Sequence, residues 1–152
     1  MRYIKIKDND IANGEGISMS LWTQGCPHHC KGCFNKETWD FKGGKKFTSK
    51  EKDYILNNIN KNEIDRNLSI LGGEPLCDEN IEGVIKLCKE FKELYPNKLI
   101  YVWTGYNIEN FNETQKSLLK YIDVLIDGKF EEDLKDITLK LRGSSNQRII
   151  KL

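Results

Sequence analysis

The middle of the sequence alternates strand-like and helix-like segments, and this order restricts the possible folds more than any other feature. Three short apolar runs, each followed by a glycine within two residues, predict strands. The two intervening segments carry apolar residues at steps of three and four, which predicts helices. A strand–helix–strand–helix–strand order favours a parallel sheet with right-handed crossovers. The predicted strands are residues 68–71, 99–103 and 124–126, and the helices are centred on residues 81–91 and 112–121.

Flanking segments add further predicted elements. Alternating residues at 2–7 predict a first strand, and residues 17–23 predict a second. Thr48 and Glu51 form a capping-box pattern that begins a helix at about 49–60. The tail has two weaker strand candidates, residues 139–141 and 148–152, which are separated by a polar loop.

Four chemically suggestive segments each follow a predicted strand. In parallel α/β folds the carboxyl ends of the strands form the ligand edge, so we expect these segments to meet there. A closed eight-stranded barrel needs about 200 residues or more, and this chain has 152. We therefore expect one α/β domain over residues 1–152, a partial, open barrel or curved sheet. The segments are Cys26–Cys33, Gly72–Pro75, Thr104–Gly105 and Asp127–Lys129.

Composition excludes several classes of protein. The 24 basic and 23 acidic residues nearly cancel, so no broad basic field for nucleic acid or for a membrane surface is expected. No apolar run has membrane-spanning length, and the polar start lacks the apolar core of a signal peptide. Three of the five cysteines lie within eight positions. Without an export signal, this favours metal binding in a reducing cytoplasm over disulfides.

The clustered cysteines have the spacing C-x3-C-x2-C, and they allow three interpretations. Buried structural thiols are disfavoured because the loop is polar. A structural zinc site would need a fourth ligand, for which His28, His29 and Cys77 are candidates. A 4Fe–4S cluster held by three thiolates would leave one iron open to a small ligand. The metal ligands in the cluster interpretation are Cys26, Cys30 and Cys33.

The cysteine spacing and the later Gly72-Gly73-Glu74-Pro75 segment together resemble the radical S-adenosylmethionine enzymes. Within that superfamily, further segments resemble the activases that install a glycyl radical in anaerobic ribonucleotide reductases. The resemblance covers nearly the whole chain, and the tail is its most discriminating part. In contrast to many superfamily members, Gly32 precedes the third cysteine and the aromatic Phe34 follows it. The further segments are residues 30–35, 102–106, 124–130 and 142–148.

This resemblance implies reductive cleavage of S-adenosylmethionine at a 4Fe–4S cluster and a glycyl radical on the large subunit of an anaerobic (class III) ribonucleotide reductase. It also implies a flavodoxin- or ferredoxin-like electron donor. Two alternatives remain: a radical enzyme acting on a small molecule, and a non-catalytic zinc-binding module. Beyond the cofactor site no catalytic side chain is expected. The resemblance assigns cofactor binding to Gly32, Cys33, Phe34, Gly72, Gly73, Glu74, Thr104, Asp127 and Lys129.

The roles of several residues are less sharply defined by the sequence. Cys88 lies on an apolar helix face and is expected in the core, whereas Cys77 is expected near the ligand edge, where it would be open to oxidation. The loop 142–148 is either a surface loop or a contact for the partner protein. His28 and His29 are expected to lie near the cysteines without binding metal.

Overall fold

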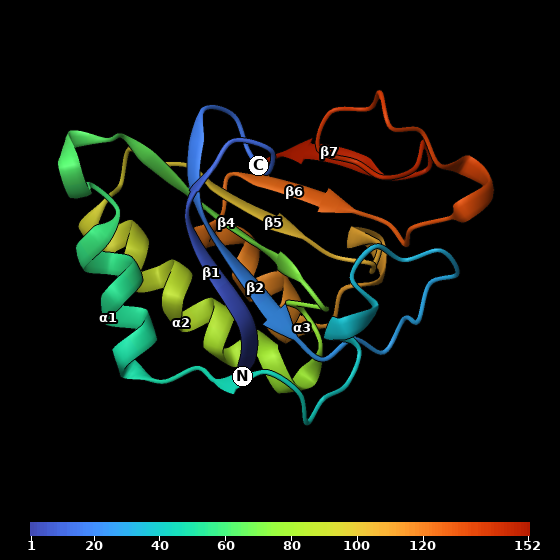
Figure 1. The fold of residues 1–152 in the computed structure, drawn as a ribbon, viewed down its shortest axis with the longest axis horizontal. Coiled ribbons are helices and arrows are strands. Elements are labelled where there is room, and N and C mark those ends of the chain that lie inside the picture. Colours follow the sequence, from blue (N-terminus) through green and yellow to red (C-terminus); the bar gives the residue numbers. More distant parts are fainter.

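The computed structural model describes residues 1–152 as a mixed α/β structure. Three α-helices and five 3-10 turns accompany one seven-stranded sheet (Figure 1). The strands are β1 (Arg2–Asp10), β2 (Ile17–Gln24), β3 (Lys45–Lys46), β4 (Arg66–Gly72), β5 (Ile100–Trp103), β6 (Val124–Asp127) and β7 (Arg148–Lys151). The helices are α1 (Ser49–Asn58), α2 (Asp78–Leu94) and α3 (Glu113–Leu118), and the turns are η1 (Lys36–Thr38), η2 (Lys61–Glu63), η3 (Ile108–Asn110), η4 (Leu119–Tyr121) and η5 (Glu132–Leu134).

The sheet is open, with the strand order β3-β1-β2-β4-β5-β6-β7. Its four central strands, β2, β4, β5 and β6, are mutually parallel, as the strand–helix alternation predicts. Antiparallel pairing adds β1 and β3 on one side and β7 on the other. The prediction of an open α/β sheet is therefore confirmed.

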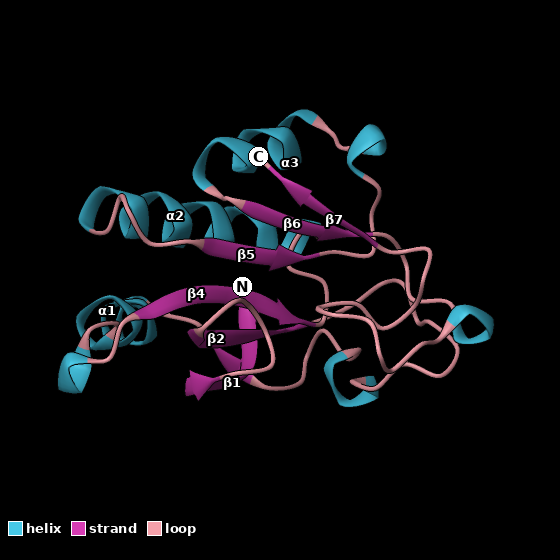
Figure 2. Ribbon diagram, turned by 90° about the horizontal axis from the view of Figure 1, so that it is seen from above, coloured by secondary structure: helices cyan, strands magenta, loops and turns pink.

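The register of β2 against β4 positions the ligand edge. The two strands pair without a shift from Ile17 opposite Arg66 to Thr23 opposite Gly72. Both strands therefore end at the same level, and the cysteine segment leaves β2 beside the glycines that end β4. Figure 2 shows the loops gathered at the end of the sheet toward which β4, β5 and β6 run.

The helices cover one face of the sheet, and the main core lies between them (Figure 2). Alternation along β5 shows the two faces: Ile100 and Val102 belong to this core, whereas Tyr101 belongs to a second, smaller cluster with Trp103 packed against it. The predicted capping box is present at the start of α1. No helix of the chain is both long and apolar enough to cross a bilayer.

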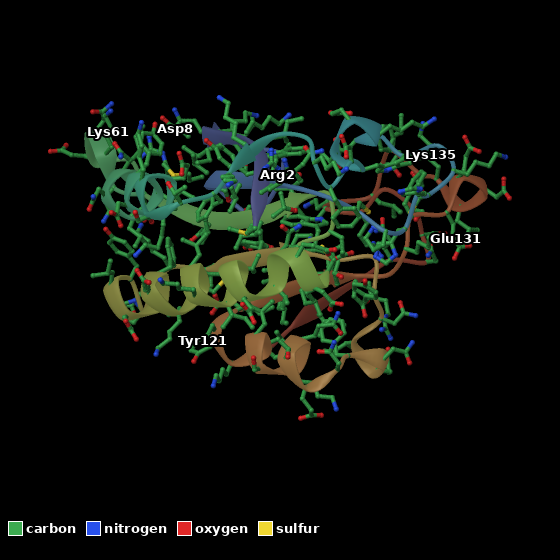
Figure 3. All side chains as sticks on the ribbon, turned by 90° about the horizontal axis from the view of Figure 1, so that it is seen from below. Arg2, Asp8, Lys61, Tyr121, Glu131 and Lys135 are labelled. Carbon is green, nitrogen blue, oxygen red and sulfur yellow. The ribbon has the colours of Figure 1, made fainter.

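The tail differs from its prediction. The predicted strand at 139–141 is wrong: this stretch is irregular, and Leu141 has a left-handed φ of 59°. The Leu141 carbonyl accepts a hydrogen bond from Trp103 Nε1 at 2.8 Å, so a side chain satisfies it in place of a strand neighbour. The predicted final strand is confirmed as β7. Figure 3 shows Glu131 and Lys135, in the irregular tail, at the opposite end of the molecule from Lys61.

Candidate cofactor site

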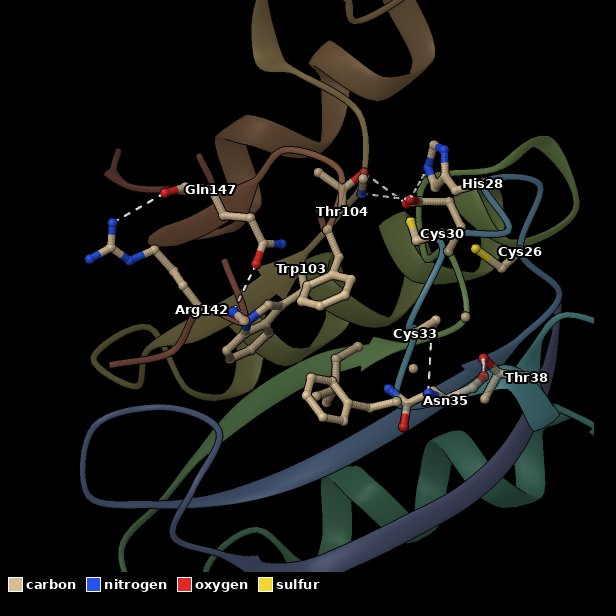
Figure 4. Close-up of a pocket in the computed structure, with 18 of the residues that line it drawn as sticks. Cys26, His28, Cys30, Cys33, Asn35, Thr38, Trp103, Thr104, Arg142 and Gln147 are labelled. Carbon is tan, nitrogen blue, oxygen red and sulfur yellow. Dashed lines mark hydrogen bonds and ion pairs between the residues drawn. The ribbon is translucent and has the colours of Figure 1, made fainter. Parts of the chain in front are cut away.

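A cavity of about 420 Å³ lies at the carboxyl edge of the sheet (Figure 4). Its volume lies within the range of small-molecule sites. All three clustered cysteines line it, together with the segment that ends β4 and the turn that ends β5. The structure thus brings together, in one cavity, Cys26, Cys30, Cys33, Phe34, Gly72, Gly73, Glu74 and Thr104 from the predicted site.

The cysteine segment is closed at its base by backbone hydrogen bonds. Gly25 N donates to the Thr38 carbonyl at 2.7 Å, and Cys26 N donates to the Trp39 carbonyl at 3.2 Å. Within the loop, Cys33 N donates to the Cys30 carbonyl at 3.1 Å. Backbone hydrogen bonds therefore fix the start of the segment and the turn from Cys30 to Cys33.

Burial governs the chemistry of these thiols. It raises the pKa of Cys26 to about 11, because a thiolate loses its hydration in the loop. Burial also raises the pKa of Cys30, and the nearby positive charge of Lys129 opposes that rise. These two side chains are thiols at neutral pH in the chain by itself. A metal or cluster that bound them as thiolates would therefore displace their protons.

The donor set fits an iron–sulfur cluster. No three His, Cys, Asp or Glu side chains converge closely enough to hold one metal ion. A cluster does not require such convergence, since each thiolate binds a different iron. Both histidines of the loop are engaged elsewhere: His28 Nε2 lies 2.7 Å from a Glu74 oxygen, and the His29 ring stacks on Trp39.

The two glycines that end β4 are required by close backbone contact. A Cβ on Gly73 would lie 2.5 Å from the Gly25 carbonyl oxygen, immediately before the first cysteine. Gly72 has φ +110°, a conformation that side chains rarely adopt, and its Cβ would meet the backbone of Thr23. The glycines therefore allow the end of β4 to pack tightly against the start of the cysteine loop.

Asp127 and Lys129 lie beside the cavity without lining it. The Asp127 carboxylate is buried, accepts hydrogen bonds from Arg148 on β7, and accepts another from Ile108 N at 2.9 Å. Lys129 is close enough to Cys30 for its charge to act on that thiol. Gly32 is also outside the lining, and a Cβ there would meet the Glu132 side chain at 2.6 Å.

Sequence reasoning missed part of the cavity wall. Trp22 and Trp103, which the sequence did not assign to the site, both line it, as do Arg142 and Gln147 from the tail. The tryptophans lie on the sheet face opposite the helices, and alternation along the predicted strands provided a signal for this. The tail residues gave no such signal, because their segment has no periodicity.

Comparison with known proteins places the chain among iron–sulfur proteins. Residues 12–150 match the family described as "4Fe-4S single cluster domain". The chain is 43% identical over 148 residues to the anaerobic ribonucleoside-triphosphate reductase-activating protein of Escherichia coli K12, covering 97% of this chain and 96% of the relative. Proteins with the same name from Haemophilus influenzae and Enterobacteria phage T4 are 40% and 39% identical over 150 residues, with 98% of this chain covered and 97% and 93% of the relatives. The chain belongs to the family of anaerobic ribonucleoside-triphosphate reductase-activating proteins.

Proposed function

We propose that this chain activates an anaerobic ribonucleotide reductase by reductively cleaving S-adenosylmethionine at a 4Fe–4S cluster. The product is a glycyl radical on the large reductase subunit. The observation that carries the proposal is that three cysteines and the Gly72–Glu74 segment line one cavity. The names of the relatives support the reductase as the target.

In this proposal Cys26, Cys30 and Cys33 hold the cluster. When bound, such a cluster supplies the electron that divides S-adenosylmethionine into methionine and a 5′-deoxyadenosyl radical, which then takes the Cα hydrogen of a glycine in the partner. With three thiolates as its protein ligands, the cluster would keep one position free for a small ligand such as S-adenosylmethionine. The protein contributes by orienting this substrate and limiting access of water.

The cavity wall divides into two parts in this proposal. Gly72, Gly73 and Glu74 form the methionine side. Cys33 and Phe34 form the adenosyl side, with Gly32 next to them in the chain but outside the lining. The Phe34 ring packs there against Phe130, with 5.7 Å between centroids. The lining provides aromatic surface for a base and polar groups at the strand ends.

Thr104, Asp127 and Lys129 complete the proposed cofactor set. Thr104 lines the cavity at the end of β5. Lys129 contributes positive charge beside Cys30, which favours a thiolate and an anionic ligand there. Because Arg148 and a backbone amide already occupy the Asp127 carboxylate, Asp127 acts by fixing the end of β6.

The open sheet suits a bulky target. We propose that residues 1–152 form a single radical S-adenosylmethionine domain, a partial barrel whose open side admits a loop of the reductase. A flavodoxin- or ferredoxin-like protein would supply the electron. The free cysteines suit the reducing conditions of the cytoplasm.

The test compares wild type with Cys30→Ala and a cysteine control, Cys88→Ala. Cys88 is fully buried in the helix-side core. After anaerobic reconstitution we expect wild type and C88A to be brown, to release 5′-deoxyadenosine and to give a doublet radical signal on the reductase by electron paramagnetic resonance. C30A should do none of these. Deoxyadenosine without the doublet would support a small-molecule substrate, and a colourless, zinc-loaded protein would support the non-catalytic module.

A further inference from the structure

The Glu74 carboxylate is saturated by donors from the protein itself. The side chain is buried, with 1% exposed. Its Oε1 accepts hydrogen bonds from Leu76 N at 2.9 Å and Thr104 Oγ1 at 2.8 Å. Its Oε2 accepts one from Gly105 N at 2.7 Å and lies 2.7 Å from His28 Nε2. The dashed lines near His28 and Thr104 in Figure 4 mark this cluster.

These contacts leave no acceptor site free on the carboxylate. A carboxylate offers about four lone-pair positions, and four donors already occupy those of Glu74. An incoming ammonium group would have to displace one of them. The Glu74 side chain is therefore better suited to holding neighbouring segments together than to binding a ligand.

His28 is the donor that comes from the cysteine segment. It lies between Cys26 and Cys30, and its side chain is 13% exposed. Its ring packs edge-on against Tyr106, with centroids 4.6 Å apart, and a Cβ on Gly105 would lie 2.5 Å from it. The ring thus fits a pocket at the end of β5 that only glycine leaves open.

The neighbouring histidine provides a contrast. His29 is exposed, and its ring stacks on Trp39, within the cysteine segment's own base. The histidine that pairs with Glu74 is His28. Of these two adjacent histidines, therefore, only His28 connects the cysteine segment to the ends of β4 and β5.

We propose that Glu74 is a positioning residue that, through His28, fixes the cysteine segment against the ends of β4 and β5. This rests on the proposed function, because the segment's position matters only if the segment holds the cluster beside its substrate. Backbone contacts set the base of the segment, with Glu74 N donating to the Gly25 carbonyl at 2.8 Å. The Glu74–His28 pair sets the part between Cys26 and Cys30.

Four variants separate the hydrogen bond from ring packing. His28→Phe keeps a ring and removes the donor, whereas His28→Gln keeps a donor and removes the ring. Gly105→Ala displaces the His28 ring by a substitution that lies outside the cysteine segment. His29→Asn is the matched control, since Asn tolerates the left-handed φ of 47° at that position.

The readouts are iron and sulfide per chain, the cluster's paramagnetic resonance spectrum titrated with S-adenosylmethionine, and the Tm of the iron-free chain. We expect H28F and G105A to show a changed spectrum and about tenfold weaker apparent binding of S-adenosylmethionine, the effect of losing one hydrogen bond to a charged group. H28Q and H29N should match wild type.

Each other outcome overturns the proposal. If H28F or G105A matches H29N in spectrum and affinity, the pair does not position the loop. If H28Q behaves as H28F, ring packing matters and the hydrogen bond does not. If H28F fails to fold, G105A decides the question alone. A wild-type chain that takes up no iron would overturn the proposed function. A wild-type chain that takes up iron, with variants that match it, would overturn only the positioning role of Glu74.

Discussion

Arg148 on β7 donates two hydrogen bonds to the fully buried carboxylate of Asp127 at the end of β6. The same guanidinium also donates to both carboxylate oxygens of Glu109, at 2.7 and 2.8 Å. One side chain therefore joins the last strand to its neighbour and to the turn after β5. This contact explains why the irregular tail returns to the sheet at the ligand edge.

The Arg148–Glu109 pair predicts a pH-dependent contribution to stability. Hydrogen bonding to Arg148 lowers the pKa of Glu109 from 4.5 to about 2. A carboxyl group whose pKa is lowered by folding stabilises the folded state at pH values above its pKa in the unfolded chain. This contribution disappears as the pH falls through the pKa in the folded chain. Glu109→Gln should therefore be less stable than wild type at pH 6, by a margin that shrinks between pH 4.5 and 2.

Urea unfolding of the iron-free chains at a series of pH values measures this margin. Because the pair is exposed, the effect should be small and should decrease with added salt. A margin that stays constant down to pH 2.5, or grows there, would show that Glu109 gains nothing from Arg148.

Gln147 fastens the tail loop by its side chain. Its amide oxygen accepts from Gly143 N at 2.8 Å and Ser144 N at 3.2 Å, and its amide nitrogen donates to the Gly128 carbonyl at 2.9 Å. Gln147→Ala should cost about 1–3 kcal/mol, since each such bond contributes about 1 kcal/mol. The amides of Gly143 and Ser144 should lose hydrogen-exchange protection.

The exposed Lys140 in the same tail provides the control, and Lys140→Ala should leave both amides protected. Equal protection in Q147A and K140A would mean that the loop is held by other contacts.

Gly73 should tolerate no side chain. The Cβ of Gly73→Ala would lie 2.5 Å from the Gly25 carbonyl oxygen, so β4 and the cysteine loop must separate. We expect a loss of about 1–3 kcal/mol in unfolding free energy, as for overpacking elsewhere, and reduced iron uptake. Chemical denaturation and iron analysis measure the two effects. Wild-type values for both would contradict the close contact.

Cys77 and Cys88 should be protected from thiol reagents in the folded, iron-free chain. Cys77 is 3% exposed, and burial raises its pKa from 9.0 to about 12, so its thiolate fraction is about a thousandfold lower than in an exposed thiol. Burial also raises the pKa of Cys88. Mass spectrometry after labelling at pH 8 should find Cys30 and Cys33 modified first. In denaturant all five cysteines should react. Rapid labelling of Cys77 in the folded chain would contradict its protection and support the expectation that this thiol is open to oxidation.

Much of the fold could be predicted because it depends on local signals. The periodicity of residues 81–91 predicts α2, and the capping box at Thr48 predicts α1. The parallel centre follows from the order of elements, and the convergence of Cys26 and Gly73 follows from both segments ending parallel strands. In these cases a local residue pattern or the order of the elements along the chain carries the signal.

The remainder depends on contacts between distant residues. Glu74 and His28 are 46 positions apart, and Arg148 and Asp127 are 21 apart. Which residues meet at these distances depends on strand register, to which composition and spacing give no access. The tail after β6 is held by side-chain hydrogen bonds to single carbonyls and amides, such as that of Trp103 to Leu141. Such bonds leave no periodic trace in the sequence.

The backbone bonds from Gly25 and Cys26 to Thr38 and Trp39 have a kinetic consequence. They restrict the chain between them during folding, so the entropy of ordering that loop is lost then and not when iron arrives. Cluster assembly should accordingly proceed at a speed set by sulfide delivery and thiol deprotonation, with little change in the amide circular dichroism.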